Sequence, residues 1–288
     1  MAVHKAGRMA GSRAGRVAVA VAAAALIGVT ASACGPDDDH NGSTLGRVSE
    51  KPAASASSGE KNPEPGAPAS GGSASGGSAS DDPGTGGPEA KAPPAASARI
   101  AKVPASVKGG VITVGDPKAK HTVKVYEDPR CPFCKRFEDG GAQALVNPVA
   151  DGKVKVEYTI ASFLDGSLGG SGSVNAANAL RASVDAGRFP QFHAAVFANQ
   201  AAQETDDAYT PAFLLKIAGK VEGLRGGAFD RAVTNGTYKK WVGEAMKAFT
   251  EDGITGTPTV LVDGEKSDGN SLYEQAAFAE ELRAAGIS

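Results

Sequence analysis

Short apolar runs separated by turn residues begin near residue 100 and continue to the end of the chain. β-branched and aromatic residues concentrate in the runs 111–114, 123–126, 154–160 and 259–262, which predict strands. Patterns rich in Ala, Leu, Lys, Gln and Glu predict helices at 132–149, 176–186, 190–203, 211–218, 227–233, 238–250 and 271–284. This order predicts an α/β fold whose sheet is interrupted by a helical insertion at about 165–250.

The chain before residue 100 has a different pattern. Residues 35–98 are mainly Gly, Ser, Ala, Pro, Asp and Glu, with almost no large apolar side chain. Such a segment buries too little apolar surface to offset the entropy lost on ordering. We therefore expect a disordered linker with a root-mean-square span of roughly 45 Å, which separates a folded head from whatever precedes it.

The first 33 residues combine basic side chains with a later apolar run. His4, Lys5 and three arginines precede the stretch Val17–Val29, which is mostly Ala and Val. Basic residues followed by an apolar run are typical of a secretory signal peptide. The alternative is a transmembrane anchor, but the run is shorter than the roughly 20 residues that cross a bilayer.

The signal ends in Ala31-Ser32-Ala33-Cys34, which resembles the lipobox of bacterial lipoproteins, although Ala31 stands where that family more often has Leu. The resemblance implies that Cys34 becomes the amino terminus and receives a diacylglycerol and palmitate. It would then hold the protein at the outer face of the cell membrane. The alternative is cleavage after Ala33 that leaves a free thiol. The predicted regions are a signal peptide (1–33), a lipidated cysteine and linker (34–99) and a head (100–286).

Charge and cysteine content narrow the function. The formal net charge is −2, and no basic stripe interleaved with aromatic residues occurs, so we expect no nucleic-acid partner. Of the three cysteines, Cys34 stands alone, whereas Cys131 and Cys134 form a pair. A pair at this spacing indicates redox or metal chemistry.

The Cys131-Pro132-Phe133-Cys134 segment lies where a strand is predicted to end and a helix to begin. The helix amino terminus favours a thiolate at Cys131, which predicts the attacking sulfur. Cys134 lies one turn further on and would resolve a mixed disulfide. Pro132 suits the first helical position, where its missing N–H is not needed.

The sequence leaves other functions of the Cys131–Cys134 pair open, namely a zinc site, a structural disulfide and copper(I) transport. Structural zinc needs four ligands, and only the scattered His121 and His193 are available as additions. A purely structural disulfide would close too short a loop to stabilise the fold much. A copper(I) carrier is the main alternative, because two exposed thiolates suit that ion. His193 itself lies among aromatic residues at helical spacing, which indicates a packed helix residue without a role in the site.

Two separated motifs resemble the DsbA-type branch of the thioredoxin superfamily, in an actinobacterial kind of lipoprotein. They are VKVYEDPRCPFCKRF at 123–137 and Gly256-Thr257-Pro258-Thr259-Val260. The resemblance covers about residues 103–286 and implies a thioredoxin-like fold with an inserted helical domain. It also implies a cis Pro258 facing the cysteines, with the backbone of Thr257 free to pair with a substrate strand.

The same resemblance implies an extracytoplasmic thiol-disulfide oxidoreductase that uses a redox-active disulfide and no bound cofactor or metal. Its expected partners are unfolded or cysteine-containing exported proteins and a membrane redox protein that recycles the pair. Phe133 replaces the His that stabilises the thiolate in DsbA, and Thr257 stands where oxidases often have Val. Both departures point away from a strong oxidase and leave the net direction open.

Glu127 and Asp128 directly precede this site. As the end of a strand, the two acids are most simply interpreted as a solvated turn. The resemblance offers a second interpretation, because a carboxylate beneath the active-site helix relays protons in related folds. Either acid would then exchange a proton with Cys134.

Overall fold

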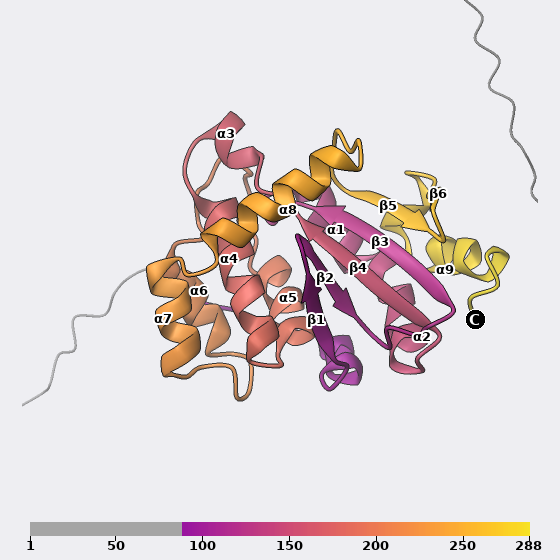
Figure 1. Cartoon of the computed structure of the whole chain (residues 1–288), viewed down its shortest axis with the longest axis horizontal. Coiled ribbons are helices and arrows are strands. Elements are labelled where there is room, and N and C mark those ends of the chain that lie inside the picture. Colours follow the sequence, from indigo (N-terminus) through magenta and orange to yellow (C-terminus); the bar gives the residue numbers. More distant parts are fainter. Residues whose placement is uncertain (1–87) are drawn as a thin grey trace, which may run out of the picture. The chain divides into compact units, whose positions relative to one another are not determined.

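The computed structural model describes residues 88–288 (Figure 1). These residues contain a six-stranded sheet with the order β1-β2-β4-β3-β5-β6. Its strands are β1 (Ala105–Lys108), β2 (Val111–Val114), β3 (His121–Glu127), β4 (Val154–Ile160), β5 (Thr259–Val262) and β6 (Glu265–Lys266). β3 and β4 run parallel, and the other pairs are antiparallel. The four strands predicted from sequence are present, and β1 and β6 were not predicted.

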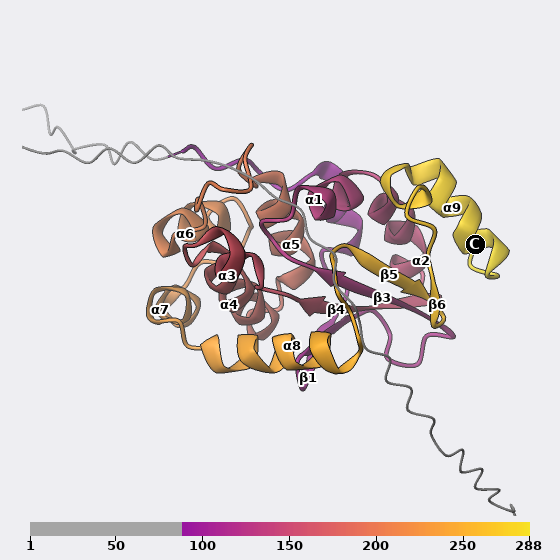
Figure 2. The same ribbon diagram turned by 90° about the horizontal axis from the view of Figure 1, so that it is seen from above.

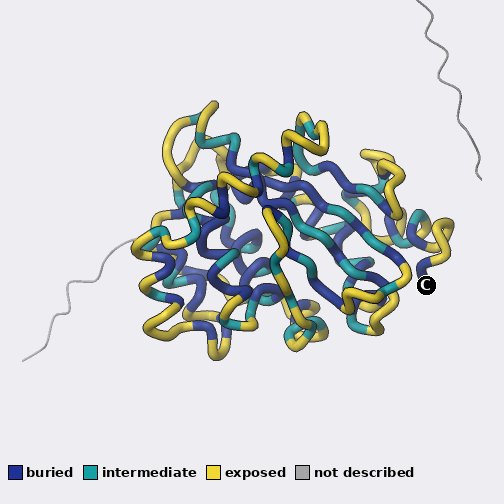
Figure 3. The backbone as a smooth tube through the Cα atoms, viewed as in Figure 1, coloured by how far each residue is buried: buried dark blue, intermediate teal, exposed yellow. Residues whose placement is uncertain are grey.

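The centre of the sheet is the pair β3 and β4, in register from His121–Val154 to Glu127–Ile160. Val123, Val125 and Val154 are fully buried in this pair. Burying each such side chain contributes roughly 1.5–3 kcal/mol. Figure 3 shows these central strands as buried or intermediate, whereas the edge strand β1 is largely exposed. The short β1, with alternating half-exposed and exposed positions, carries little apolar signal, which is why sequence reasoning missed it.

Helices cover both faces of the sheet (Figure 2). One face carries α1 (Pro132–Asp139), the 3-10 helix η2 (Gly141–Leu145), α2 (Val146–Ala150) and α9 (Gln275–Ala284), and the other carries α8 (Lys239–Glu251). The prediction of one continuous helix over 132–149 is wrong, because the helix breaks at Gly140-Gly141. The carbonyls of the 3-10 helix η3 (Ser271–Tyr273) approach so closely there that a Cβ on either glycine would collide with them.

The helical insertion lies between β4 and β5, as predicted. It consists of α3 (Leu164–Leu168), α4 (Gly172–Asp185), α5 (Phe189–Ala198), α6 (Pro211–Ala218), α7 (Gly227–Asn235) and α8. Its core includes the fully buried Leu180 and Leu214 and an edge-to-face pair of Phe192 and Phe229 at 5.6 Å. α5 ends earlier than the predicted residue 203. It stops before Asn199, whose side chain donates back to the carbonyl of Ala195.

The head begins earlier than the predicted residue 100. Residues 95–100 form the 3-10 helix η1, in which Ser97 is buried. Ala90 is also buried, and the backbone of Lys91 exchanges two hydrogen bonds of 2.7 and 2.9 Å with the Asn199 side chain. The composition of this segment does not predict that it is ordered, because the side chain that holds it, Asn199, follows α5 and is distant in sequence. The predicted signal peptide, Cys34 and most of the linker lie outside the described residues.

Within residues 88–288, no helix has the length and apolarity required to cross a membrane.

Candidate active site

Cys131 caps the amino terminus of α1. The chain leaves β3, turns through Asp128 to Arg130, and enters the helix with Pro132 at one of its first two positions. The backbone N–H of Cys131 donates to the Asp128 carbonyl at 2.9 Å, which closes the turn. This places the sulfur of Cys131 at the positive end of the helix, where a thiolate is stabilised.

The two sulfurs have opposite proton affinities. The pKa of Cys131 is lowered to about 6, chiefly by a hydrogen bond from Cys134 and also by the Thr257 side chain and the backbone N–H groups of Cys134 and Phe133. Burial, the bond to Cys131 and the charges of Cys131 and Glu127 raise the pKa of Cys134 well above its usual value. At pH 7 roughly nine Cys131 side chains in ten are therefore thiolates, while Cys134 remains a thiol.

The Thr257–Pro258 peptide bond is cis, as predicted, and its loop faces the cysteines. In the protonated state the Cys131 thiol donates to the Thr257 carbonyl over 3.4 Å. The same residue thus offers a backbone acceptor to the thiol and a side chain that favours the thiolate. The two sequence motifs that suggested the site are in direct contact.

Phe133 is half exposed and is the one large apolar side chain on the surface of the described residues. Its ring lies 6.2 Å from that of Tyr273, and the guanidinium of Arg136 lies 4.3 Å from the Tyr273 centroid and 5.8 Å from that of Phe133. A cation over an aromatic face is attracted to it. An apolar and basic surface therefore lies directly beside Cys131.

The solvated-turn interpretation of Glu127 and Asp128 is wrong, because both side chains are fully buried. Asp128 accepts hydrogen bonds from the Ser173 hydroxyl at 2.6 Å and from the N–H groups of Arg130 at 3.0 Å and Leu164 at 3.2 Å. Burial still raises its pKa to about 6. Asp128 therefore anchors the loop, and Glu127 is the acid that is electrostatically coupled to both cysteines.

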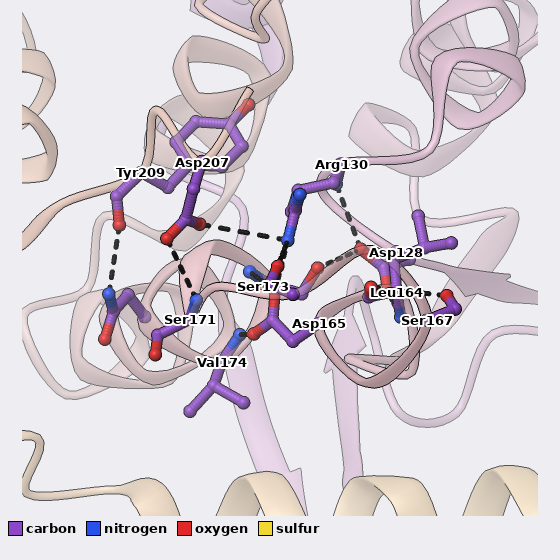
Figure 4. Close-up of polar contacts among 12 residues, drawn as sticks. Asp128, Arg130, Leu164, Asp165, Ser167, Ser171, Ser173, Val174, Asp207 and Tyr209 are labelled. Atoms are coloured by element: carbon purple, nitrogen blue, oxygen red, sulfur yellow. Dashed lines mark hydrogen bonds and ion pairs between the residues drawn. The ribbon is translucent and has the colours of Figure 1, made fainter. Parts of the chain in front are cut away.

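A second anchor of the loop is Arg130, buried against the helical insertion (Figure 4). It donates to the carboxylate of Asp165 at 2.8 Å and to the carbonyls of Gly169 and Glu204. The amide of Gln200 on the other side donates to the carbonyls of Pro129 and Cys131, at 2.8 and 2.9 Å. The insertion thus fixes the backbone that carries the attacking sulfur.

Sequence reasoning missed two residues of the site, Glu138 and His193. His193 is a packed residue of α5, as predicted, but its Nε2 lies 2.5 Å from Oε1 of Glu127, and its Nδ1 lies 3.7 Å from Oε2 of Glu138. The helical periodicity of the sequence could have indicated that both residues point toward the interior. Glu138 lies four residues after Cys134 on α1, and His193 lies four residues from both Phe189 and Phe197, so both point inward.

These three side chains are the described residues best placed to hold a metal, because their ligand atoms all lie within 4.8 Å of one another. Neither cysteine belongs to the group. The zinc interpretation of the Cys131–Cys134 pair therefore lacks additional ligands in the described part of the chain. The copper(I) interpretation expected two exposed thiolates, whereas both cysteines are buried.

A buried thiol beneath a thiolate at a helix amino terminus, facing a cis-proline loop, defines a thioredoxin-like oxidoreductase site. The chain matches the family described as Thioredoxin over residues 107–279, more than half of its length, and it belongs to that family. No curated protein sequence matches it.

Solved structures similar to the chain include thiol-disulfide oxidoreductases. It shares 27% identity with the reduced disulfide bond oxidoreductase DsbG of Mycobacterium tuberculosis, with a TM-score of 0.50, over 61% of this chain and 84% of that one. Reduced DsbA of the same organism shares 26% identity with the chain at a TM-score of 0.52, over 62% of this chain and 94% of that one. MdbA of Actinomyces oris, a thiol-disulfide oxidoreductase, shares 26% identity with the chain at a TM-score of 0.52. The match covers 66% of this chain and 96% of that one. The chain is accordingly a thiol-disulfide oxidoreductase.

Proposed function

We propose that the chain exchanges disulfides with cysteine-containing exported proteins through Cys131 and Cys134, at the outer face of a membrane. The observation that carries this proposal is the split between the two thiols. Cys131 has a pKa of about 6 and lies at the end of a helix, whereas the buried Cys134 beneath it holds its proton. Thiol-disulfide exchange requires one nucleophilic thiolate and one resolving thiol within reach of it.

In the reducing direction, the Cys131 thiolate attacks a substrate disulfide, and one substrate sulfur leaves with the electron pair as a thiolate. Cys134 then loses its proton and attacks the Cys131 sulfur. This forms the Cys131–Cys134 disulfide and releases the second substrate thiolate. The oxidising direction reverses these steps, so two electrons pass from the substrate to the enzyme disulfide. The electrons are held by the cysteine pair itself, which requires no cofactor.

Formation of the mixed disulfide makes Cys134 easier to deprotonate. While Cys131 is a thiolate, its charge and its hydrogen bond both raise the pKa of Cys134, and its charge also raises that of Glu127. Bonding Cys131 to a substrate sulfur removes that charge. The pKa of Cys134 then falls, so its proton leaves more easily, and the pKa of Glu127 falls as well, so more of this carboxyl is ionised and able to accept a proton.

Thr257 and Phe133 define where a substrate would bind. The Thr257 carbonyl contacts the attacking sulfur, so a substrate strand pairing with this backbone would bring its own cysteine to Cys131. Phe133 and Arg136 would accommodate an apolar or aromatic side chain beside that cysteine. The substrate class is therefore unfolded polypeptide, recognised mainly through its backbone.

The stability of the thiolate sets how strong an oxidant the enzyme disulfide is. Lowering the pKa of the attacking thiol stabilises the reduced enzyme and makes its disulfide a stronger oxidant. A pKa of about 6 lies between the values of about 7 for thioredoxin and about 3.5 for DsbA. This value supports an oxidant weaker than DsbA, in agreement with the replacement of the thiolate-stabilising His by Phe133.

The proposed location rests on the sequence of residues 1–34 alone. A signal peptide, a lipidated Cys34 and a linker would tether the head outside the cell, where exported proteins fold and a membrane redox partner recycles the pair. Loss of membrane association in a Cys34→Ala chain, with unchanged activity, is the result expected for lipidation. A Cys34→Ala chain that stays in the membrane fraction contradicts it.

The test of the activity mixes the oxidised chain with a reduced, unfolded ribonuclease and measures its recovery of disulfides. The parent should accelerate recovery over the uncatalysed reaction, and Cys131→Ser should not. The matched control is Cys34→Ala, which leaves the pair intact and should perform as the parent does. Equal recovery with Cys131→Ser would exclude the proposed role of this sulfur.

A further inference from the structure

A buried chain of three titratable side chains extends inward from the cysteines. Glu127 ends β3, Glu138 lies on α1 and His193 lies on α5, so three separate elements supply it. The imidazole faces each carboxylate with a different ring nitrogen, Nε2 toward Glu127 and Nδ1 toward Glu138. No other described residue donates to the buried Oε2 of Glu127 or Oε1 of Glu138, and the two carboxyls also act directly on each other, so that the protonated one hydrogen-bonds the other.

The two ends of this chain have different surroundings. Glu127 is the member whose charge acts on Cys134. Glu138 and His193 line a cavity of about 50 Å³ whose other walls include Ser97 of η1 and Gln143 of η2. A cavity needs only about 10–15 Å³ to hold a water molecule, provided that polar partners are present. The chain thus extends from the resolving thiol to a space that accommodates water.

We propose that Glu127, His193 and Glu138 form a proton relay, in which His193 and Glu138 connect the resolving thiol Cys134 to water in the cavity beneath η1. This inference rests on the proposed disulfide exchange and assigns roles to two positioning residues that touch no substrate. It also gives a route for the proton on the side of α1 away from the substrate.

The relay starts with Glu127 and Glu138 as carboxylates and with the proton of the neutral His193 imidazole on Nδ1. When Cys134 attacks Cys131, its proton passes to Glu127. The Glu127 carboxylic acid donates that proton to Nε2 of His193, while Nδ1–H of His193 donates a proton to the Glu138 carboxylate. Glu138 releases a proton to water, and the imidazole has changed tautomer without becoming charged at rest. In the oxidising direction each transfer runs in reverse and supplies a proton to the Cys134 thiolate.

The electrostatics of the site agree with this arrangement. Burial lowers the pKa of His193, which favours the neutral imidazole that a tautomer shift requires. Burial raises the pKa of Glu138 to about 8, so near neutral pH its acid and its carboxylate form are both populated, and the carboxylate form is the one that accepts a proton. The other titratable groups that act on the chain are Tyr158 of β4, whose ring lies 4.7 Å from that of His193, the two cysteines, and Asp128 and Asp139, whose charges raise the pKa values of Glu127 and Glu138. The Tyr158 pKa is raised well above its usual value, so it stays neutral.

The ligand atoms of these three side chains also lie within 4.8 Å of one another, a spacing that a metal chelate requires. A chelate uses one ring nitrogen of a histidine, whereas here each nitrogen faces its own carboxylate. The observed orientation therefore favours proton transfer. Metal binding is an outcome that the experiment below detects.

The experiment follows each cysteine separately in the reduced full-length Cys34→Ala chain. One equivalent of 5,5′-dithiobis(2-nitrobenzoic acid) releases one thionitrobenzoate when Cys131 attacks and a second when Cys134 resolves the mixed disulfide. Stopped-flow absorbance resolves the two phases at a series of pH values. Glu138→Gln and His193→Gln should each slow the second phase about tenfold or more at pH 7, within the range known for general-base catalysis. The first phase should change less than about twofold, because Cys131 needs no relay.

Both variants should also make the second phase depend more steeply on pH, because solvent hydroxide must replace the lost relay. Phe189→Leu is the matched control, since it loosens the packing around His193, 5.2 Å away between rings, without changing a charge. It should leave the pH profile unchanged. If Glu138→Gln does not fold, the comparison between His193→Gln and Phe189→Leu carries the test.

Three results would overturn the relay: an unchanged second phase, equal slowing of both phases, or retention of one Zn²⁺ per parent chain that His193→Gln abolishes. A parent that releases no second thionitrobenzoate would instead contradict the proposed disulfide exchange.

Discussion

Removing the hydrogen bond from Cys134 should raise the pKa of Cys131, because that bond is the largest cause of its lowering to about 6. A hydrogen bond to a charged group contributes about 1.5–3 kcal/mol, and one pKa unit corresponds to about 1.4 kcal/mol. Cys134→Ala should therefore raise the pKa by about 1–2 units. The backbone N–H groups and Thr257 remain, so the value should not return to that of a free cysteine.

The assay is the thiolate absorbance at 240 nm during a pH titration of the Cys34→Ala chain, where Cys131 is the one remaining cysteine in each Cys134 variant. Cys134→Ser is the matched control, because its hydroxyl still donates and should hold the midpoint near that of the parent. At pH 6 the Ala variant should contain at least about fivefold fewer thiolates and react correspondingly more slowly with iodoacetamide. Identical midpoints in the Ala and Ser variants would refute the reasoning and assign the low pKa to the helix terminus.

Three further predictions concern stability, each measured by urea unfolding. Arg130→Met should lower the free energy of unfolding by about 3–5 kcal/mol, because it leaves the buried Asp165 carboxylate without its ion pair; a loss under about 1 kcal/mol would contradict the anchoring role. Burial raises the pKa of Asp128 from 3.8 to about 6, so ionisation of Asp128 opposes folding. Its contribution is fully present below about pH 4 and falls by up to about 3 kcal/mol as the pH rises through 6. Asp128→Asn should remove that part of the pH dependence, and parallel profiles would argue against it. Phe137→Ala, at a fully buried position, should cost about 3–5 kcal/mol, whereas Phe133→Ala, at a half-exposed one, should change stability by less than about 0.5 kcal/mol; similar losses would contradict the observed burial.

Much of the architecture was predictable from the sequence because it depends on local patterns. The β-branched runs that form β2, β4 and β5, and the Ala- and Leu-rich helices of the insertion, have clear periodicity. The Cys131–Cys134 spacing and the Thr257-Pro258 motif predicted the paired thiols and the loop that faces them. These features can be predicted without knowledge of contacts between residues that are distant in sequence.

The errors arose where distant contacts decide the structure. The helix after Cys131 breaks at Gly140-Gly141 because a segment more than 130 residues later packs against it. Residues 88–99 are held by Asn199, which their own composition does not show. Glu127 was interpreted first as a solvated residue because strand ends are commonly exposed, and only the fold buries it against His193.

The two missed site residues illustrate the same limit. A histidine flanked by phenylalanines at helical spacing predicts burial correctly, but spacing alone does not identify the acid that meets it. Glu138 lies on the same face of α1 as Cys134, which was visible in the sequence. Its importance depends on α5 packing beneath α1, and that contact is tertiary.

The central claim is that Cys131 is the sulfur that forms the covalent link to substrate and Cys134 the one that resolves it. Its most direct test is mass spectrometry of the complex trapped when each single-cysteine chain, in the Cys34→Ala background, meets a disulfide-containing unfolded protein. We expect a mixed disulfide on Cys131 in Cys134→Ala and none on Cys134 in Cys131→Ala, because Cys134 is buried and its pKa is raised. Adducts at both sulfurs in equal amount, or at Cys134 alone, would contradict it.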